Sequence, residues 1–103
     1  MRVEWTLLAE SERDKIADYI CDSFGISAMK AFIQEVRETT KRLIRFPNMA
    51  SKDPLFEDRD DTYRSVFING LSKLVYRVDG DIIYVVGFWD CRRDPVAQAK
   101  RVK

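Results

Sequence analysis

The segment YRSVFINGLSKLVYRVDGDIIYVVGFWD, residues 63–90, decides the fold that the sequence predicts. It holds three β-prone runs separated by two tight-turn signals, Asn69-Gly70 and Asp79-Gly80, whose residues tolerate the backbone angles of hairpin turns. The last run, residues 82–89, has almost no polar residue, which is typical of an inner strand covered on both faces. Residues 63–90 are therefore predicted to form a three-stranded meander.

A short strand and a helix are predicted at the beginning of the chain. Residues 2–7 alternate, with Val3, Trp5 and Leu7 on the apolar side, which indicates a half-buried strand. Ser11 opens a pattern that resembles a capping box, so a helix is expected to begin near residue 11 and to end at Gly25. The residues on its apolar stripe are expected to be Ile16, Ala17, Ile20 and Phe24, with Tyr19 at the edge.

A second helix is expected after Ser27, because apolar residues recur at spacings of three and four as far as Ile44. Pro47 ends it. The connection between the helices is so short that they are expected to lie antiparallel, as an αα-hairpin. Residues 48–62, with Pro54 and a cluster of acidic residues, are expected to form an exposed loop.

The order of the elements predicts an α+β fold, β-α-α-β-β-β, in one domain that covers residues 1–103. The helical hairpin is expected to pack on one face of a small, antiparallel-rich sheet. A chain of 103 residues has the common size of a single domain and can bury a core without disulfides or metals.

The residue types that are missing exclude several kinds of site. The chain has no histidine and only two cysteines, Cys21 and Cys91. Cys/His zinc sites and Ser-His or Cys-His nucleophile pairs are therefore excluded, and neither a metal nor a cofactor is expected. No apolar run approaches the roughly 20 residues that span a bilayer, and the N-terminus lacks a signal-peptide pattern. A cytoplasmic protein without membrane contact is expected.

The charges are unevenly distributed, although the formal net charge is only +1. Residues 53–61 hold five acidic residues against one arginine, a local charge of −4. Residues 37–52 and residues 92–103 each hold five basic residues against one acidic residue, a local charge of +4. This pattern favours oriented contact with a charged partner, and the alternative is a solvated surface with a basic tail.

Five basic residues are candidates for contacting a target or a partner protein: Arg64, Lys73, Arg77, Arg92 and Arg93. Lys73 and Arg77 share one side of the middle strand, which is an open face if the helices cover the other side. Register decides on which face Arg64 lies. A basic open face can seat a phosphate backbone or an acidic protein segment, and ordinary pairing with Asp or Glu is the alternative.

Arg92 and Arg93 directly follow the end of the inner strand, where a rigid element presents side chains at the rim of the sheet. The fixed fork of a guanidinium suits bidentate contact with phosphate or carboxylate. Asp90 and Asp94 bracket the pair and are the alternative partners. Cys91 is expected to have a lowered thiol pKa beside Arg92, but the chain offers no base to complete a nucleophilic site.

Taken in order, these elements resemble the RelE/ParE toxins of bacterial and archaeal toxin–antitoxin modules. The matching segments cover most of the chain and are Val3-Glu4-Trp5, Ile16-Ala17-Asp18-Tyr19-Ile20, Ala31-Phe32-Ile33, Leu43-Ile44-Arg45-Phe46-Pro47, Tyr63-Arg64, Leu74-Val75-Tyr76-Arg77-Val78 and Asp90-Cys91-Arg92-Arg93-Asp94-Pro95. The resemblance implies a toxin that is held inactive by a cognate antitoxin, whose extended or helical tail wraps it. It also implies a toxin–antitoxin hetero-oligomer, or a homodimer of the toxin alone.

The target differs between the branches that the sequence resembles. RelE-like members cleave mRNA in the ribosome with a cluster of basic residues, but Phe67 stands where such nucleases tend to be basic, and no Tyr or His follows Pro95. ParE-like members bind DNA gyrase, and the Arg-Arg-Asp-Pro ending is more similar to theirs. We therefore expect a gyrase-binding toxin without catalytic residues. A ribosome-dependent endoribonuclease, or a non-toxic relic that only binds its antitoxin, remains the alternative.

Overall fold

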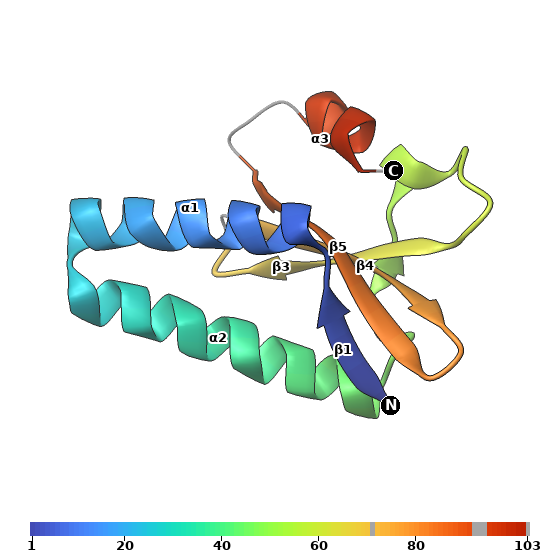
Figure 1. The fold of residues 1–103 in the computed structure, drawn as a ribbon, viewed down its shortest axis with the longest axis horizontal. Coiled ribbons are helices and arrows are strands. Elements are labelled where there is room, and N and C mark those ends of the chain that lie inside the picture. The colour runs from blue at the N-terminus through green and yellow to red at the C-terminus, as the bar shows by residue number, and fades with distance from the viewer. Residues whose placement is uncertain (71, 92–94, 103) are drawn as a thin grey trace.

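The computed structural model describes residues 1–70, 72–91 and 95–102. Figure 1 shows a helical hairpin beside a small twisted sheet, which confirms the predicted α+β class. The elements are β1 (Arg2–Trp5), α1 (Leu7–Phe24), α2 (Ile26–Arg45), β2 (Ser51–Lys52), the 3-10 helix η1 (Pro54–Phe56), β3 (Tyr63–Ile68), β4 (Ser72–Asp79), β5 (Ile82–Asp90) and α3 (Pro95–Arg101). The two-residue strand β2, the turn of η1 and the C-terminal helix α3 add to the predicted order.

The sheet has the strand order β1-β5-β4-β3-β2, with β1 parallel to β5 and the other pairs antiparallel. The meander is thus confirmed, and β5 is the inner strand that its apolar sequence predicted. Asn69 and Gly70 have φ angles of 50° and 72°, and Gly80 has a φ angle of 60°, so both turn signals mark real turns. Gly87 packs directly beneath α3, since a Cβ there would lie 3.0 Å from Gln98 Nε2.

Helix α1 begins four residues before the predicted position. Thr6 is its N-cap, and the Thr6 side-chain oxygen accepts a hydrogen bond from the backbone N–H of Ala9 at 3.2 Å. The Ser11 prediction was wrong because a hydroxyl directly after β1 already caps the helix. Leu7 was assigned to the inner side of the strand, but it is the first helical residue and is 85% exposed.

One residue, Gly25, separates the two helices, which confirms the antiparallel hairpin seen in Figure 1. Its φ of 96° and ψ of 172° are accessible to glycine and strained for other residues. Phe24 was expected on the buried stripe but is 70% exposed, because the tip of the hairpin extends beyond the sheet (Figure 1). Helix α2 ends at Arg45, two residues before Pro47, as predicted.

The main core lies between the hairpin and the sheet. Phe88 of β5 lies near its centre, with its ring 5.8 Å from Phe32 and 6.1 Å from Trp5 between ring centroids. The buried members of this core are Ala9, Ala17, Phe32, Val36, Leu43, Ile68, Leu74, Tyr76, Ile83, Val85 and Phe88. Burial of each large apolar side chain contributes roughly 1.5–3 kcal/mol, so this face carries most of the stability.

A second, smaller core lies on the opposite face of the sheet. Phe56 of η1 stacks on Tyr63 with 5.0 Å between ring centroids, and Val102 packs with them. The guanidinium of Arg59 donates to the backbone oxygen of Val102 at 2.6 Å and also to that of Ala99. The prediction that residues 48–62 form an exposed loop was therefore wrong for Phe56, which is 2% exposed. The loop and α3 together cover part of this face.

Candidate functional site

The predicted basic residues do not form one cluster. Lys73 and Arg77 lie on the face of β4 opposite the helical hairpin, as expected from their alternation with Leu74 and Tyr76. Arg64 pairs in register with Tyr76 and donates to the backbone oxygen of Ala50 at 2.7 Å. It therefore lies on the other face, apart from Lys73 and Arg77. Arg92 and Arg93 lie outside the described residues.

Lys73 is buried rather than presented on an open face. It is 8% exposed, and its Nζ lies 2.8 Å from Oδ2 of Asp53, which is itself 4% exposed. Asp53 also accepts the backbone N–H of Leu55 at 3.0 Å and so caps η1. The expectation of an open-face cation at Lys73 was wrong, because the loop that carries Asp53 folds over it. A contact of Lys73 with a target stays a prediction that would require this pair to open.

The guanidinium of Arg77 is partly exposed on the face of the sheet opposite the helical hairpin. Its guanidinium carbon lies 4.6 Å from the centroid of the Tyr84 ring, and its Nη1 lies 3.5 Å from Oδ2 of Asp79. Stacking on an aromatic ring and a partly exposed ion pair leave an arginine available to a further anion. Arg77 is therefore the described candidate on this face that best fits contact with a partner.

Cys91 is not an activated thiol. Burial, the largest cause, raises the pKa of its thiol, and the nearby charge of Asp90 raises it further, while Lys73 lowers it. The expected lowering of this pKa was therefore wrong. A thiol with a raised pKa is mostly protonated at neutral pH and is a poor nucleophile. In the described parts of the chain, no group of three His, Cys, Asp or Glu side chains is placed to hold a metal ion.

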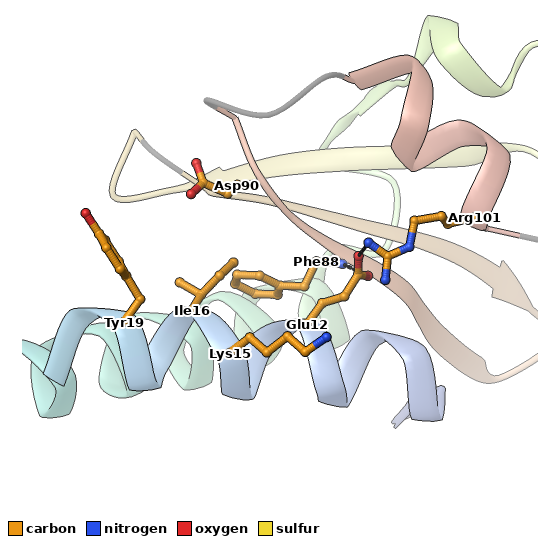
Figure 2. Close-up of a pocket in the computed structure, with 7 residues that line it drawn as sticks. All are labelled: Glu12, Lys15, Ile16, Tyr19, Phe88, Asp90 and Arg101. Carbon is orange, nitrogen blue, oxygen red and sulfur yellow. Dashed lines mark hydrogen bonds and ion pairs between the residues drawn. The ribbon is translucent and has the colours of Figure 1, made fainter. Parts of the chain in front are cut away.

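A concave surface follows helix α1, and we call it the α1 groove. It consists of two adjoining cavities of about 290 and 320 Å³ that share Ile16, Tyr19 and Asp90 as lining residues. Figure 2 shows the first cavity, with side chains of α1 on one side and of β5 on the other. Each cavity taken alone is at or below the small end of the volume range for small-molecule pockets, and two adjoining cavities can take neighbouring side chains of a bound peptide.

One end of the α1 groove is apolar and open. Phe24 and Tyr19 are 70% and 45% exposed, and their rings meet edge to face with 6.4 Å between centroids. Ile20, Ala28 and Phe32 line the same cavity. Exposed large apolar side chains gathered on one side of a small domain mark an interaction surface.

The other end of the α1 groove contains a buried carboxylate. Glu12 is 5% exposed, and its Oε1 accepts the backbone N–H of Phe88 at 3.1 Å. Strand β1 ends at Trp5 and pairs with β5 only as far as Val85. The Glu12 carboxylate therefore accepts a backbone N–H of β5 that has no neighbouring strand to bond with. Its Oε2 lies 3.7 Å from Nη1 of Arg101, and a dashed line marks this contact in Figure 2.

Glu12 was missed as a site residue in the sequence, although a signal was present. It lies four residues before Ile16, hence on the apolar stripe of α1, where a charged residue is unusual. The late helix start near residue 11 placed Glu12 in the first turn, where an acidic residue is ordinary. The correct start at Leu7 places Glu12 beyond the first turn and on the buried face of α1.

Comparison with known proteins relates the chain to a family of toxins and to solved structures of the same fold. The family model described as "ParE toxin of type II toxin-antitoxin system, parDE" matches residues 3–95. A solved structure titled "Chromosomal ParDE TA system from P. aeruginosa" is similar with a TM-score of 0.70 and 21% identity, covering 87% of this chain and 95% of that chain. At this identity the likeness concerns the fold. A search of curated protein sequences found no significant match.

Proposed function

The chain belongs to the ParE toxin family of type II toxin–antitoxin systems, and we propose that it arrests growth in the cytoplasm by binding DNA gyrase. A cognate antitoxin neutralises it by covering its surface in a hetero-oligomer. No helix among the described residues is long and apolar enough to cross a membrane.

The buried, paired position of Lys73 is the observation that favours a gyrase-binding toxin over an RNA-cleaving enzyme. A nuclease of this fold would need several cationic donors that converge on one phosphate. Lys73 is instead paired with Asp53 at 2.8 Å, and Arg64 lies on the opposite face of the sheet. Phe67, which pairs in register with Lys73, is 63% exposed and adds an apolar surface rather than a charge. The exposed Phe67 on β3 and the partly exposed Arg77 on β4 each suit contact with a protein target.

The α1 groove supports the proposed antitoxin contact. Its apolar end holds exposed aromatic side chains, Tyr19 and Phe24, at the tip of the hairpin. An amphipathic helix or an extended segment that lays apolar side chains into such a groove is a recurrent mode of peptide recognition. We assign target contact to Arg77 together with Arg92 and Arg93, and antitoxin contact to the groove.

Controlled expression in a bacterial host tests the toxin role directly. We expect growth arrest, and we expect a small neighbouring gene whose product relieves the arrest on co-expression. The purified protein should inhibit supercoiling by gyrase or trap gyrase-dependent cleaved plasmid. Cutting of mRNA on translating ribosomes with gyrase unaffected would establish the endoribonuclease instead, and normal growth after strong expression would leave only the non-toxic relic.

The variant Arg92→Ala/Arg93→Ala tests the arginine pair. Interface arginines are frequent hot spots, so we expect the concentration for half-inhibition of gyrase to rise at least about tenfold. The matched control is Arg2→Ala/Arg37→Ala, which removes the same charge from exposed positions on β1 and α2. Equal toxicity of both double variants would refute the role assigned to the pair.

A further inference from the structure

The exposed side of helix α2 carries a row of cations that the proposed function does not use. Lys30, Arg37 and Lys41 follow one another at spacings of seven and four residues, which places them on one side of the helix. Arg45 continues the row at the end of the helix, and all four residues are exposed. With a rise of about 1.5 Å per residue, the row is about 22 Å long. We call these four residues the basic face of α2.

Few anions compensate the basic face of α2. The helix holds five basic residues against two acidic ones, Glu35 and Glu38. Glu35 accepts the backbone N–H of Asn69 at 2.9 Å, so its carboxylate lies toward the sheet. The Oε1 of Glu38 lies 3.5 Å from the Lys41 Nζ and also accepts the side-chain amide of Gln34 at 2.9 Å. Exposed pairs of this kind contribute little energy, so a net positive charge remains along the helix.

Arg37 is an unpaired cation near the middle of this face. It lines a cavity of about 320 Å³ between α1 and α2, beside Arg13. Arg13 is already compensated, since its Nη2 lies 3.0 Å from Oδ1 of Asp14 and its guanidinium carbon lies 4.7 Å from the centroid of the Trp5 ring. In the part of the chain that the structure describes, no anion pairs with Arg37. Its guanidinium is therefore available to an anion of a ligand.

The side chains between the cations distinguish the kinds of partner. The exposed residues of α2 between Ile26 and Ile44 are small, polar or charged: Ser27, Lys30, Ala31, Gln34, Arg37, Glu38, Lys41 and Arg42. The core of a protein–protein interface is rich in aromatic side chains and methionine. Proteins that bind single-stranded nucleic acid offer aromatic rings on which the bases stack. This stretch of α2 offers neither, whereas contact with a duplex backbone requires only cations.

The rest of the molecule presents the basic face of α2 to a polyanion. The other side of the helix is buried against the core at Phe32, Val36 and Leu43, so the helix is a rigid support. Figure 1 shows α2 on one side of the molecule and η1 on the opposite side. The acidic residues 53–61, with their local charge of −4, therefore lie away from the basic face. Such a separation of charge orients a molecule in the field of a polyanion.

We propose that the basic face of α2 binds the phosphate backbone of double-stranded DNA without reading its sequence. A duplex carries about one negative charge per 1.7 Å of its axis, so a row of about 22 Å spans roughly a dozen phosphates. The four cations of the face neutralise about four of them. This inference goes beyond the proposed function, because it concerns a surface other than Arg77 and the α1 groove, and a partner other than gyrase or the antitoxin.

Fluorescence anisotropy of the purified full chain with a labelled duplex of about 20 base pairs measures this contact. Four neutralised phosphates predict a slope of about −3.6 for the logarithm of the association constant against the logarithm of the salt concentration. The affinity should therefore fall roughly 150-fold between about 50 and 200 mM salt. A second duplex of unrelated sequence should bind equally well. A slope shallower than about −1, or a preference between the duplexes above about tenfold, would overturn the proposal.

The double variant Arg37→Gln/Lys41→Gln locates the contact. It removes two cations from the basic face, keeps good helix formers in their place, and should reduce the steepness of the salt dependence by about 1.8. The matched control Lys15→Gln/Lys100→Gln removes the same charge from exposed positions on α1 and α3 and should leave the slope unchanged. Equal losses in the two double variants would show that only the net charge matters and would refute the assignment to α2.

The exchange Arg37→Lys/Lys41→Arg separates backbone contact from other recognition, and it keeps all the charges of the face. A phosphate backbone needs the charges rather than the planar fork of a particular guanidinium, so this variant should bind the duplex with unchanged affinity. A loss above about tenfold with an unchanged circular dichroism spectrum would contradict the proposal. A poly-glutamate peptide that binds more tightly than the duplex would assign the face to an acidic protein segment and would also overturn it.

The outcomes separate this inference from the proposed function, because the binding measurements use neither gyrase nor living cells. A chain that binds the duplex through α2 but leaves gyrase and growth unaffected would refute the proposed function and support this inference. A chain that inhibits gyrase but does not bind the duplex on its own would refute this inference alone.

Discussion

Replacing Lys73 by methionine is expected to lower the free energy of unfolding by about 3 kcal/mol. The change keeps most of the apolar stem of the side chain. It removes the Lys73 Nζ, which lies 2.8 Å from Asp53 Oδ2 in the unaltered protein, and so leaves the Asp53 carboxylate buried without its cation. Loss of one partner of a buried pair costs roughly 3–5 kcal/mol. The lower end applies because Asp53 keeps the hydrogen bond from the Leu55 N–H and lies in a loop that can relax toward water.

Urea unfolding measures this cost. With a slope of roughly 1.5 kcal/mol per molar urea for a domain of this size, the transition midpoint should fall by about 2 M. Asp53→Asn keeps the cap on η1 and should also destabilise. The double variant Asp53→Asn/Lys73→Met should be more stable than the sum of the single changes predicts, with a coupling energy of about 2 kcal/mol. A loss below about 0.5 kcal/mol for Lys73→Met, or strict additivity of the two single changes, would show that Lys73 is not paired with Asp53. Lys73 would then again be a candidate, beside Arg77, for contact with a target.

Three further changes test the rest of the structure. Burial raises the pKa of the Tyr76 hydroxyl above its ordinary value of 10.0. The folded protein therefore keeps Tyr76 protonated where the unfolded chain ionises, so stability should fall as pH rises above about 10. Tyr76→Phe should flatten that fall in denaturation curves and cost about 1 kcal/mol at neutral pH through loss of the 2.7 Å bond to the Pro47 oxygen. Gly25→Ala should lower the stability measured by thermal denaturation by about 1–3 kcal/mol, because a φ of 96° strains any residue with a Cβ. An unchanged stability would show that the connection between α1 and α2 has a different backbone conformation. Arg59→Ala should speed hydrogen exchange in α3 about tenfold while β5 stays protected, and equal protection of α3 would contradict the anchoring role of Arg59.

The elements of the fold could be predicted because each has a local cause. The turn glycines, the apolar run of β5 and the spacing in α2 act over a few residues, and all were confirmed. The start of α1 was missed since Thr6 and Ser11 are both acceptable caps. Only the hydrogen bond of the Thr6 backbone N–H to Val85, which holds Thr6 at the end of β1, distinguishes them.

The candidate site was harder to predict, because its charges are set by contacts between distant segments. The sequence by itself determined the family-like order of elements, the absence of histidine chemistry and the side of β4 on which Lys73 and Arg77 lie. Only the tertiary structure decided that Asp53, 20 residues away, neutralises Lys73, and that Arg101 of α3 approaches Glu12 of α1. The physical reason is that periodicity fixes the direction of a side chain relative to its own strand or helix, whereas burial and charge pairing depend on which other segment folds over it.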